Sequence, residues 1–77
     1  MRKRLPRLTA REIVRVLARR GFELSRSSGS HHIYKDATDK RVTVPVHAKQ
    51  TLHPKILQCI LRDMDMSAEQ LKKELGQ

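Results

Sequence analysis

The chain has 77 residues, with 17 lysines and arginines against 8 aspartates and glutamates, and a formal net charge of +9 at pH 7. A chain of this length forms one small domain that buries only roughly 60–65% of the surface exposed when unfolded, which excludes a deep cleft between two lobes. No apolar run approaches the ~20 residues of a membrane-spanning helix, and the single cysteine excludes an internal disulfide, so the composition favours a cytoplasmic protein without membrane contacts.

Positive charge is concentrated before residue 63. Residues 1–62 carry 15 lysines and arginines against 4 acidic residues, whereas residues 63–77 carry 2 against 4. A basic body of this size attracts polyanions, and nucleic-acid phosphates are the most common of these in a cell. The alternative is a charged surface that only keeps a small protein in solution. We favour nucleic-acid binding because a sequence pI near 10.7 is typical of such proteins.

The first predicted element is a helix over residues 10–20, which follows a basic leader at residues 1–8. The sequence Thr9-Ala10-Arg11-Glu12 has the pattern of a capping box, and Gly21 suits a left-handed stop. Apolar residues recur at the 3–4 spacing of one buried helix face. Arg11, Arg15 and Arg19 recur every four residues, which places three guanidinium groups in one stripe facing solvent or phosphate.

Three strands are predicted next. Residues 22–26 alternate apolar and polar as a strand with one buried face does, and residues 31–35 resume strand character after the turn at 27–30, so the two segments form a hairpin. Residues 41–46 give the strongest strand signal, with valines 42, 44 and 46 on one face. Because Pro45 lacks an amide hydrogen, this strand is expected at a sheet edge.

A second helix is predicted from Pro54 to about residue 64, since proline is well suited to a first helical turn. Cys59 lies in the middle of this helix pattern, between Leu57 and Ile60, and is expected in the core or at its margin. Ser67-Ala68-Glu69-Gln70 is a second capping box that opens a short helix. The resulting prediction is a single α+β domain over residues 9–77, with two layers, a three-stranded antiparallel sheet and helices on one sheet face.

The most distinctive local run is Gly29-Ser30-His31-His32, where a glycine turn enters a strand. Adjacent strand residues point to opposite faces, so at most one of the two histidines can serve a given site. An imidazole can take a proton from a ribose 2′-OH and return one to a leaving oxygen, while nearby cations stabilise charge on the phosphate. The pattern is compatible with metal-free RNA cleavage, although surface histidines are mostly not catalytic.

Other chemistries lack the residues that they need. The four histidines and Cys59 have no spacing typical of zinc sites, and a serine nucleophile at Ser30 lacks the Gly-x-Ser-x-Gly elbow. Nucleotide-binding glycine loops are absent, and the scattered carboxylates would not hold two metal ions. We therefore expect no metal and no cofactor, and any nuclease activity should resist chelators.

The chain resembles the HicA toxin family over roughly residues 8–75. The resemblance is carried by the joint order of several motifs: Leu8-Thr9-Ala10-Arg11-Glu12, Gly21-Phe22-Glu23-Leu24, Gly29-Ser30-His31-His32-Ile33-Tyr34, Arg41-Val42-Thr43-Val44-Pro45-Val46-His47 and Leu52-His53-Pro54-Lys55. HicA proteins are small RNA-cleaving toxins of bacterial and archaeal toxin–antitoxin pairs. The joint order is far more specific than any one motif.

The resemblance implies a fold like the double-stranded RNA-binding domain, with the order α-β-β-β-α. It also implies an endoribonuclease, or mRNA interferase, that cleaves mRNA without a metal through one histidine of the Gly-Ser-His segment. A HicB-like antitoxin would cover and neutralise that site. By the Gly-Ser-His pattern His31 is the expected catalytic residue, and His32 is the alternative.

Several polar residues are expected to support RNA binding: Arg11, Arg15, Arg19, Arg26, Ser30, Lys35 and Lys49. His47 could be a second acid or base, or a loop histidine without a role. Tyr34 is expected to pack in the core rather than to stack on a base. The basic leader either extends the RNA contact surface or is disordered.

Two other classes of function remain open at this point. The same fold could be a non-catalytic module that binds structured RNA by shape and phosphate contacts. Alternatively, the basic surface could serve an acidic antitoxin in transcriptional autoregulation. Intact RNA in the presence of tight, salt-sensitive binding would identify the first of these alternatives.

Overall fold

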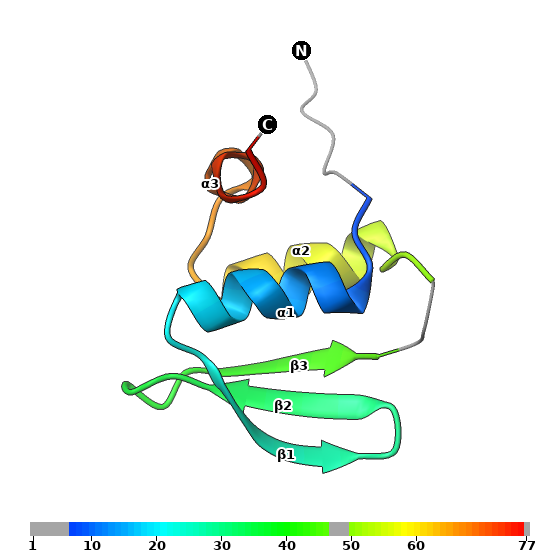
Figure 1. Ribbon diagram of the computed structural model, residues 1–77, viewed down its shortest axis with the longest axis vertical. Helices are drawn as coiled ribbons and strands as arrows, with labels where there is room; N and C mark the ends of the chain where they lie inside the picture. The colour runs from blue at the N-terminus through cyan, green and yellow to red at the C-terminus, as the bar shows by residue number, and fades with distance from the viewer. Residues whose placement is uncertain (1–6, 47–49, 77) are drawn as a thin grey trace.

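The computed structural model describes residues 7–46 and 50–76, which form a sheet with helices on one of its faces (Figure 1). The elements in chain order are α1 (Ala10–Arg19), β1 (Glu23–Ser28), β2 (His31–Lys35), β3 (Arg41–Pro45), α2 (Pro54–Asp63) and α3 (Ala68–Glu74). The strands form one antiparallel sheet in the order β1-β2-β3. This confirms the predicted two-layer α+β fold and its resemblance to the double-stranded RNA-binding domain.

The helix ends are fixed by the residues that the sequence singled out. The Thr9 hydroxyl accepts from the Glu12 amide while the Glu12 side chain accepts from the Thr9 amide, which completes the capping box of α1. Helix α1 ends at Arg19, one residue before the predicted end. Ser67 and Gln70 repeat the same arrangement at α3. Pro54 occupies the first turn of α2, where its missing N–H breaks no helical bond.

The core lies between the sheet and the helices. From the sheet, Tyr34, Val42 and Val44 are buried, and the alternation of β3 places both valines on the helix side. The fully buried helical side chains are Ile13, Val16, Leu17, Leu57, Ile60 and Leu71. Tyr34 therefore packs as expected. Among the described helices, none is both long and apolar enough to cross a membrane.

Strand β1 departs from the sequence prediction. All six of its residues are exposed, and Leu24 keeps 54% of its surface accessible, so the expectation of one buried face was wrong. The helices pack chiefly against β3, at the opposite edge of the sheet, and none of the described helices packs extensively on β1 (Figure 1). The register also shifts between Leu24 and Arg26, which leaves Ser25 as a β-bulge.

Cys59 also departs from the prediction, because its side chain is exposed. At 100° per residue, Cys59 lies about 200° around α2 from the buried Leu57 and about 100° from the buried Ile60. It therefore faces solvent, where the Arg62 guanidinium donates to its sulfur at 3.7 Å. The period of the α-helix is therefore sufficient to predict that Cys59 is exposed.

Candidate nucleic-acid interface

The sheet face opposite the helices, which we call the open face, consists of three rows of cross-strand partners. Strand alternation relative to the buried Tyr34, Val42 and Val44 assigns residues to this face. Its rows are Ser28–His31–Pro45, Arg26–Ile33–Thr43 and Glu23–Lys35–Arg41. One histidine and three cations of the chain are thereby brought onto a single surface.

The fold separates the two adjacent histidines. His31 is exposed and belongs to the open face, while His32 is half-buried and pairs with Val44, whose side chain is in the core. Alternation along β2 thus directs His32 toward the helical layer. Only His31 is presented to a large ligand on the open face.

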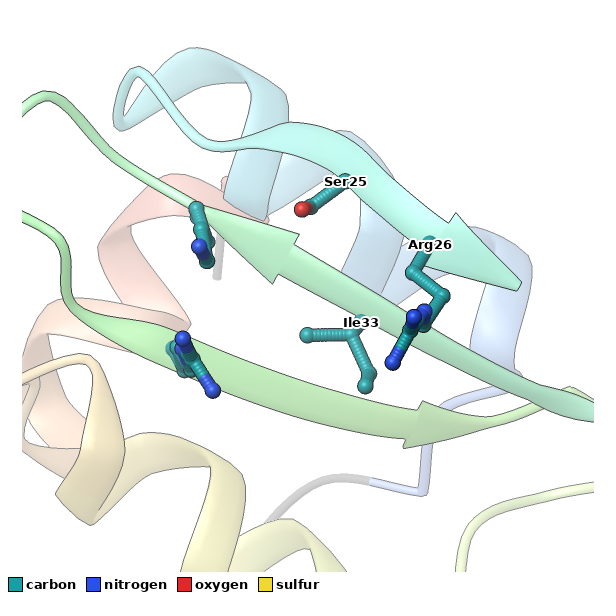
Figure 2. A pocket seen from close by; sticks show the side chains of 5 residues that line it. Ser25, Arg26 and Ile33 are labelled. Atoms are coloured by element: carbon teal, nitrogen blue, oxygen red, sulfur yellow. The ribbon is translucent and has the colours of Figure 1, made fainter. Parts of the chain in front are cut away.

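A shallow hollow lies on the open face beside His31. It is lined by Ser25, Arg26, Ile33, Lys35 and Arg41 and has a volume of about 380 Å³ (Figure 2). Ile33 is half-buried, and Figure 2 shows its side chain between the strands with Arg26 alongside. Three positively charged side chains around one small hollow attract a group with concentrated negative charge.

In the part of the chain that the structure describes, no ion pair or side-chain hydrogen bond neutralises the cations of this hollow, as is also the case for Arg11 and Arg15 on α1. Arg26, Lys35 and Arg41 have no such partner there. By contrast, the Lys40 ammonium lies 2.6 Å from an Asp65 carboxylate oxygen. The hydrogen bond from Lys40 to Asp65 raises the pKa of Lys40, despite some desolvation.

A second, smaller hollow adjoins the row of His31. Pro45, the cross-strand partner of His31, lines it together with residues of the 50–53 segment and Ile56 of α2, and its volume is about 190 Å³. His53 contributes its ring there, with Nδ1 accepting from the Lys55 amide. His31 therefore lies between a basic hollow and a more apolar one.

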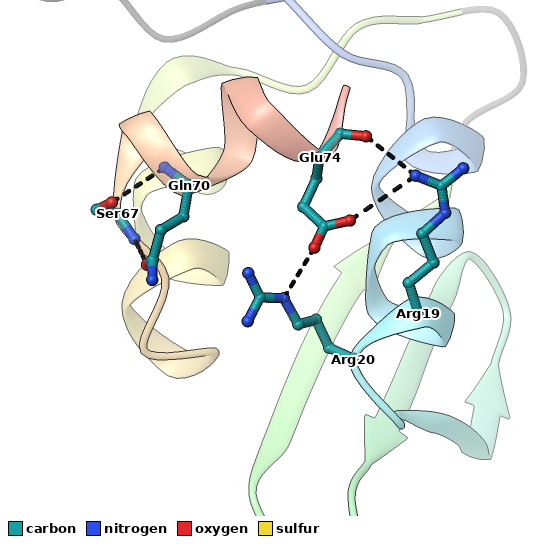
Figure 3. Close-up of polar contacts among 5 residues, drawn as sticks. All are labelled: Arg19, Arg20, Ser67, Gln70 and Glu74. Atoms are coloured by element: carbon teal, nitrogen blue, oxygen red, sulfur yellow. Dashed lines mark hydrogen bonds and ion pairs between the residues drawn. The ribbon is translucent and has the colours of Figure 1, made fainter. Parts of the chain in front are cut away.

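The arginines of α1 lie in the helical layer rather than on the open face. Arg11, Arg15 and Arg19 are all exposed, as the spacing predicted. Arg19 is engaged by the end of α3: its Nη1 lies 3.0 Å from the Glu74 carbonyl oxygen and 3.7 Å from the carboxylate (Figure 3). Arg20 reaches the same carboxylate at 3.3 Å. The structure does not bring this stripe next to His31.

The remaining expected site residues lie elsewhere. Ser30 is half-buried in the turn between β1 and β2, where its carbonyl oxygen accepts from the Val46 amide at 2.6 Å. Lys49 and His47 lie outside the described residues, as do residues 1–6 of the leader. Leu8, which the sequence assigned to that leader, is buried in the core.

Sequence reasoning did not single out Arg41. The signal was present, because Arg41 alternates with Val42 and Val44 and must therefore face away from them. What the sequence did not contain was the register that sets Arg41 across from Lys35. Among the described residues, no three histidine, cysteine or carboxylate side chains are grouped so as to hold a metal ion.

A comparison with protein families agrees with this geometry. The model of the HicA toxin of bacterial toxin–antitoxin systems matches residues 10–66, which contain α1, the whole sheet and α2 but not α3. A comparison with curated proteins gave no significant match. Because the match spans most of the chain and both of its structural layers, the protein belongs to the HicA toxin family.

Proposed function

We propose that this protein is the toxin of a toxin–antitoxin pair, and that it cleaves mRNA in the cytoplasm without a metal or cofactor. His31 is the general acid–base, and a HicB-like antitoxin neutralises the toxin. Membership of the HicA family supports the toxin role. The observation that carries the catalytic assignment is the exposure of His31 on the open face, one row from the unpaired Arg26.

The proposed reaction is an intramolecular transesterification of the RNA. The His31 imidazole takes the proton of a ribose 2′-OH, and the 2′-oxygen attacks the adjacent phosphorus. The bond from phosphorus to the 5′-oxygen breaks as the imidazolium returns a proton to that oxygen. The products are a 2′,3′-cyclic phosphate and a 5′-hydroxyl, with no change in oxidation state. Arg26 is diagonal to His31 across β1 and β2, within reach of the phosphate charge.

The open face also suits neutralisation by a protein. A partner that covered this face would block His31 and screen its cations in one step. The antitoxin surface that meets Arg26, Lys35 and Arg41 would then be acidic. The same surface would exclude RNA by direct competition.

The experiment compares wild type, His31→Ala and His32→Ala on a defined RNA in EDTA, with products resolved on a denaturing gel. Loss of general acid–base catalysis should lower the rate of the His31 variant by about 10²–10⁴-fold. His32→Ala should retain activity in proportion to its folded fraction, measured by thermal denaturation. Intact RNA in all lanes with binding retained would instead identify a non-catalytic RNA-binding module.

A further inference from the structure

We infer that the part of the basic hollow formed by Lys35 and Arg41 is a binding site for the RNA phosphate next to the one that is cleaved. This inference rests on the proposed function, since it places the hollow relative to a phosphodiester held at His31. It adds Arg41 to the interface. It also assigns a ligand, a phosphodiester of single-stranded RNA, to the hollow on the open face.

The spacing of residues along β2 determines which side chains can contact two successive phosphates of one RNA strand. Residues on one face of a strand are about 7 Å apart, so Ile33 lies about 7 Å and Lys35 about 13 Å from His31. The hollow extends over these two rows. Successive phosphates of a single strand are separated by about one such row, and the long side chains of Lys35 and Arg41 can cover the remaining distance. A strand with one phosphate at His31 and Arg26 therefore brings the next one to Lys35 and Arg41.

Charge and shape favour a phosphate over an acidic protein segment. The hollow is small and mostly polar, with the Ser25 hydroxyl at its rim and only Ile33 as an apolar contact. Protein interfaces usually depend on buried aromatic or aliphatic anchors, which this hollow lacks. Glu23 on β1 and Arg41 on β3 lie on opposite sides of Lys35. Because the Glu23 carboxylate repels a phosphate, the phosphate is expected on the Arg41 side.

The first test measures binding without cleavage. The probe is a short 2′-O-methyl RNA, which lacks the nucleophilic hydroxyl, titrated by fluorescence anisotropy at several salt concentrations. Removing one phosphate contact in Arg41→Gln should reduce the slope of log K against log salt by about 0.7. Arg41→Lys keeps the charge and should keep the slope. Arg62→Gln removes the same charge from an exposed position on α2, and as the matched control it should keep the wild-type slope.

The second test measures position. Wild type should cleave a trinucleotide, which has a second phosphate, faster than a dinucleotide, and Arg41→Gln should remove most of that advantage. An unchanged affinity and slope in Arg41→Gln would overturn the inference even if RNA cleavage were intact. If no RNA were cleaved by any variant, the proposed function would be refuted. The anisotropy titration would still test whether the hollow binds a phosphate.

Discussion

Leu17 and Leu24 are the same residue type in opposite environments. Leu17 is fully buried in the core, whereas Leu24 on β1 is more than half exposed. Leu17→Ala should lower the free energy of unfolding by about 2–5 kcal/mol, because it removes buried methyl groups and leaves a cavity. Leu24→Ala should change it by no more than about 0.5 kcal/mol. Urea denaturation of the two variants checks this, and equal losses would contradict the exposure of β1.

Asp36 organises the turn between β2 and β3. Its carboxylate accepts from the Thr38 hydroxyl and from the amides of Thr38 and Lys40 at 2.8–2.9 Å. Partial desolvation acts to raise the pKa of Asp36, but these hydrogen bonds and the nearby Lys40 charge outweigh it, so the pKa is lowered. The ionised form is thus favoured by folding.

This lowered pKa predicts a pH dependence of stability. Its contribution is present above the unfolded pKa of about 3.9 and is lost as the pH falls through the lower folded value. Asp36→Asn keeps the acceptor oxygen but not the charge, so its melting temperature should lie below that of wild type at neutral pH. The gap should close in acid, once Asp36 is protonated. Thermal melts across pH test this, and a gap independent of pH would contradict it.

At the scale of elements, the start of α1 depends on one side chain. The Thr9 hydroxyl accepts from the Glu12 amide, and the Thr9 amide donates back to the Glu12 carboxylate, so Thr9→Ala leaves the Glu12 amide without its capping partner. We expect a loss of about 1 kcal/mol in the free energy of unfolding. Thr9→Ser retains the hydroxyl and should lose much less. Denaturant titration distinguishes the two variants, and equal losses would show that packing of the threonine methyl, not capping, is responsible.

Sequence reasoning succeeded for elements wherever the cause is local. Capping boxes at Thr9 and Ser67, the proline at the start of α2 and the alternating valines of β3 act within a few residues, and each appears as predicted. The bulge at Ser25 and the exposure of β1 depend on which strands the helices cover. That coverage is a property of the tertiary packing, which the alternation of residues 22–26 does not reveal.

At the scale of the whole molecule, α3 is joined to the basic body by charge as well as by the buried Leu71. Glu74 engages Arg19 and Arg20 (Figure 3), while Lys40 engages Asp65 just before α3. These residues are partly exposed, so Glu74→Gln should cost less than about 1 kcal/mol of stability. It should strengthen RNA binding at low salt, because the carboxylate that neutralises Arg19 and Arg20 is removed and the net charge rises. Anisotropy at low and high salt checks this, and an affinity unchanged at low salt would contradict it.

The candidate site was only partly predictable for the same reason. Alternation allowed one of the two histidines to serve a site, and the family pattern favoured His31. The face that each histidine occupies became known only with the helical layer in place. Arg26 and Lys35 were expected near the glycine turn, but Arg41 joined them through the register of β2 and β3, which pairs residues distant in the chain.

Strand β1 is an exposed edge of the sheet, where a strand of another chain could pair with it. An exposed sheet edge presents unpaired N–H and C=O groups that can template the strand of another molecule. The bulge at Ser25 twists this edge and interrupts its hydrogen-bonding repeat, and Arg26 next to it adds a charge that repels a second copy. The feature that shapes the rim of the basic hollow therefore also protects this small domain from edge-to-edge aggregation.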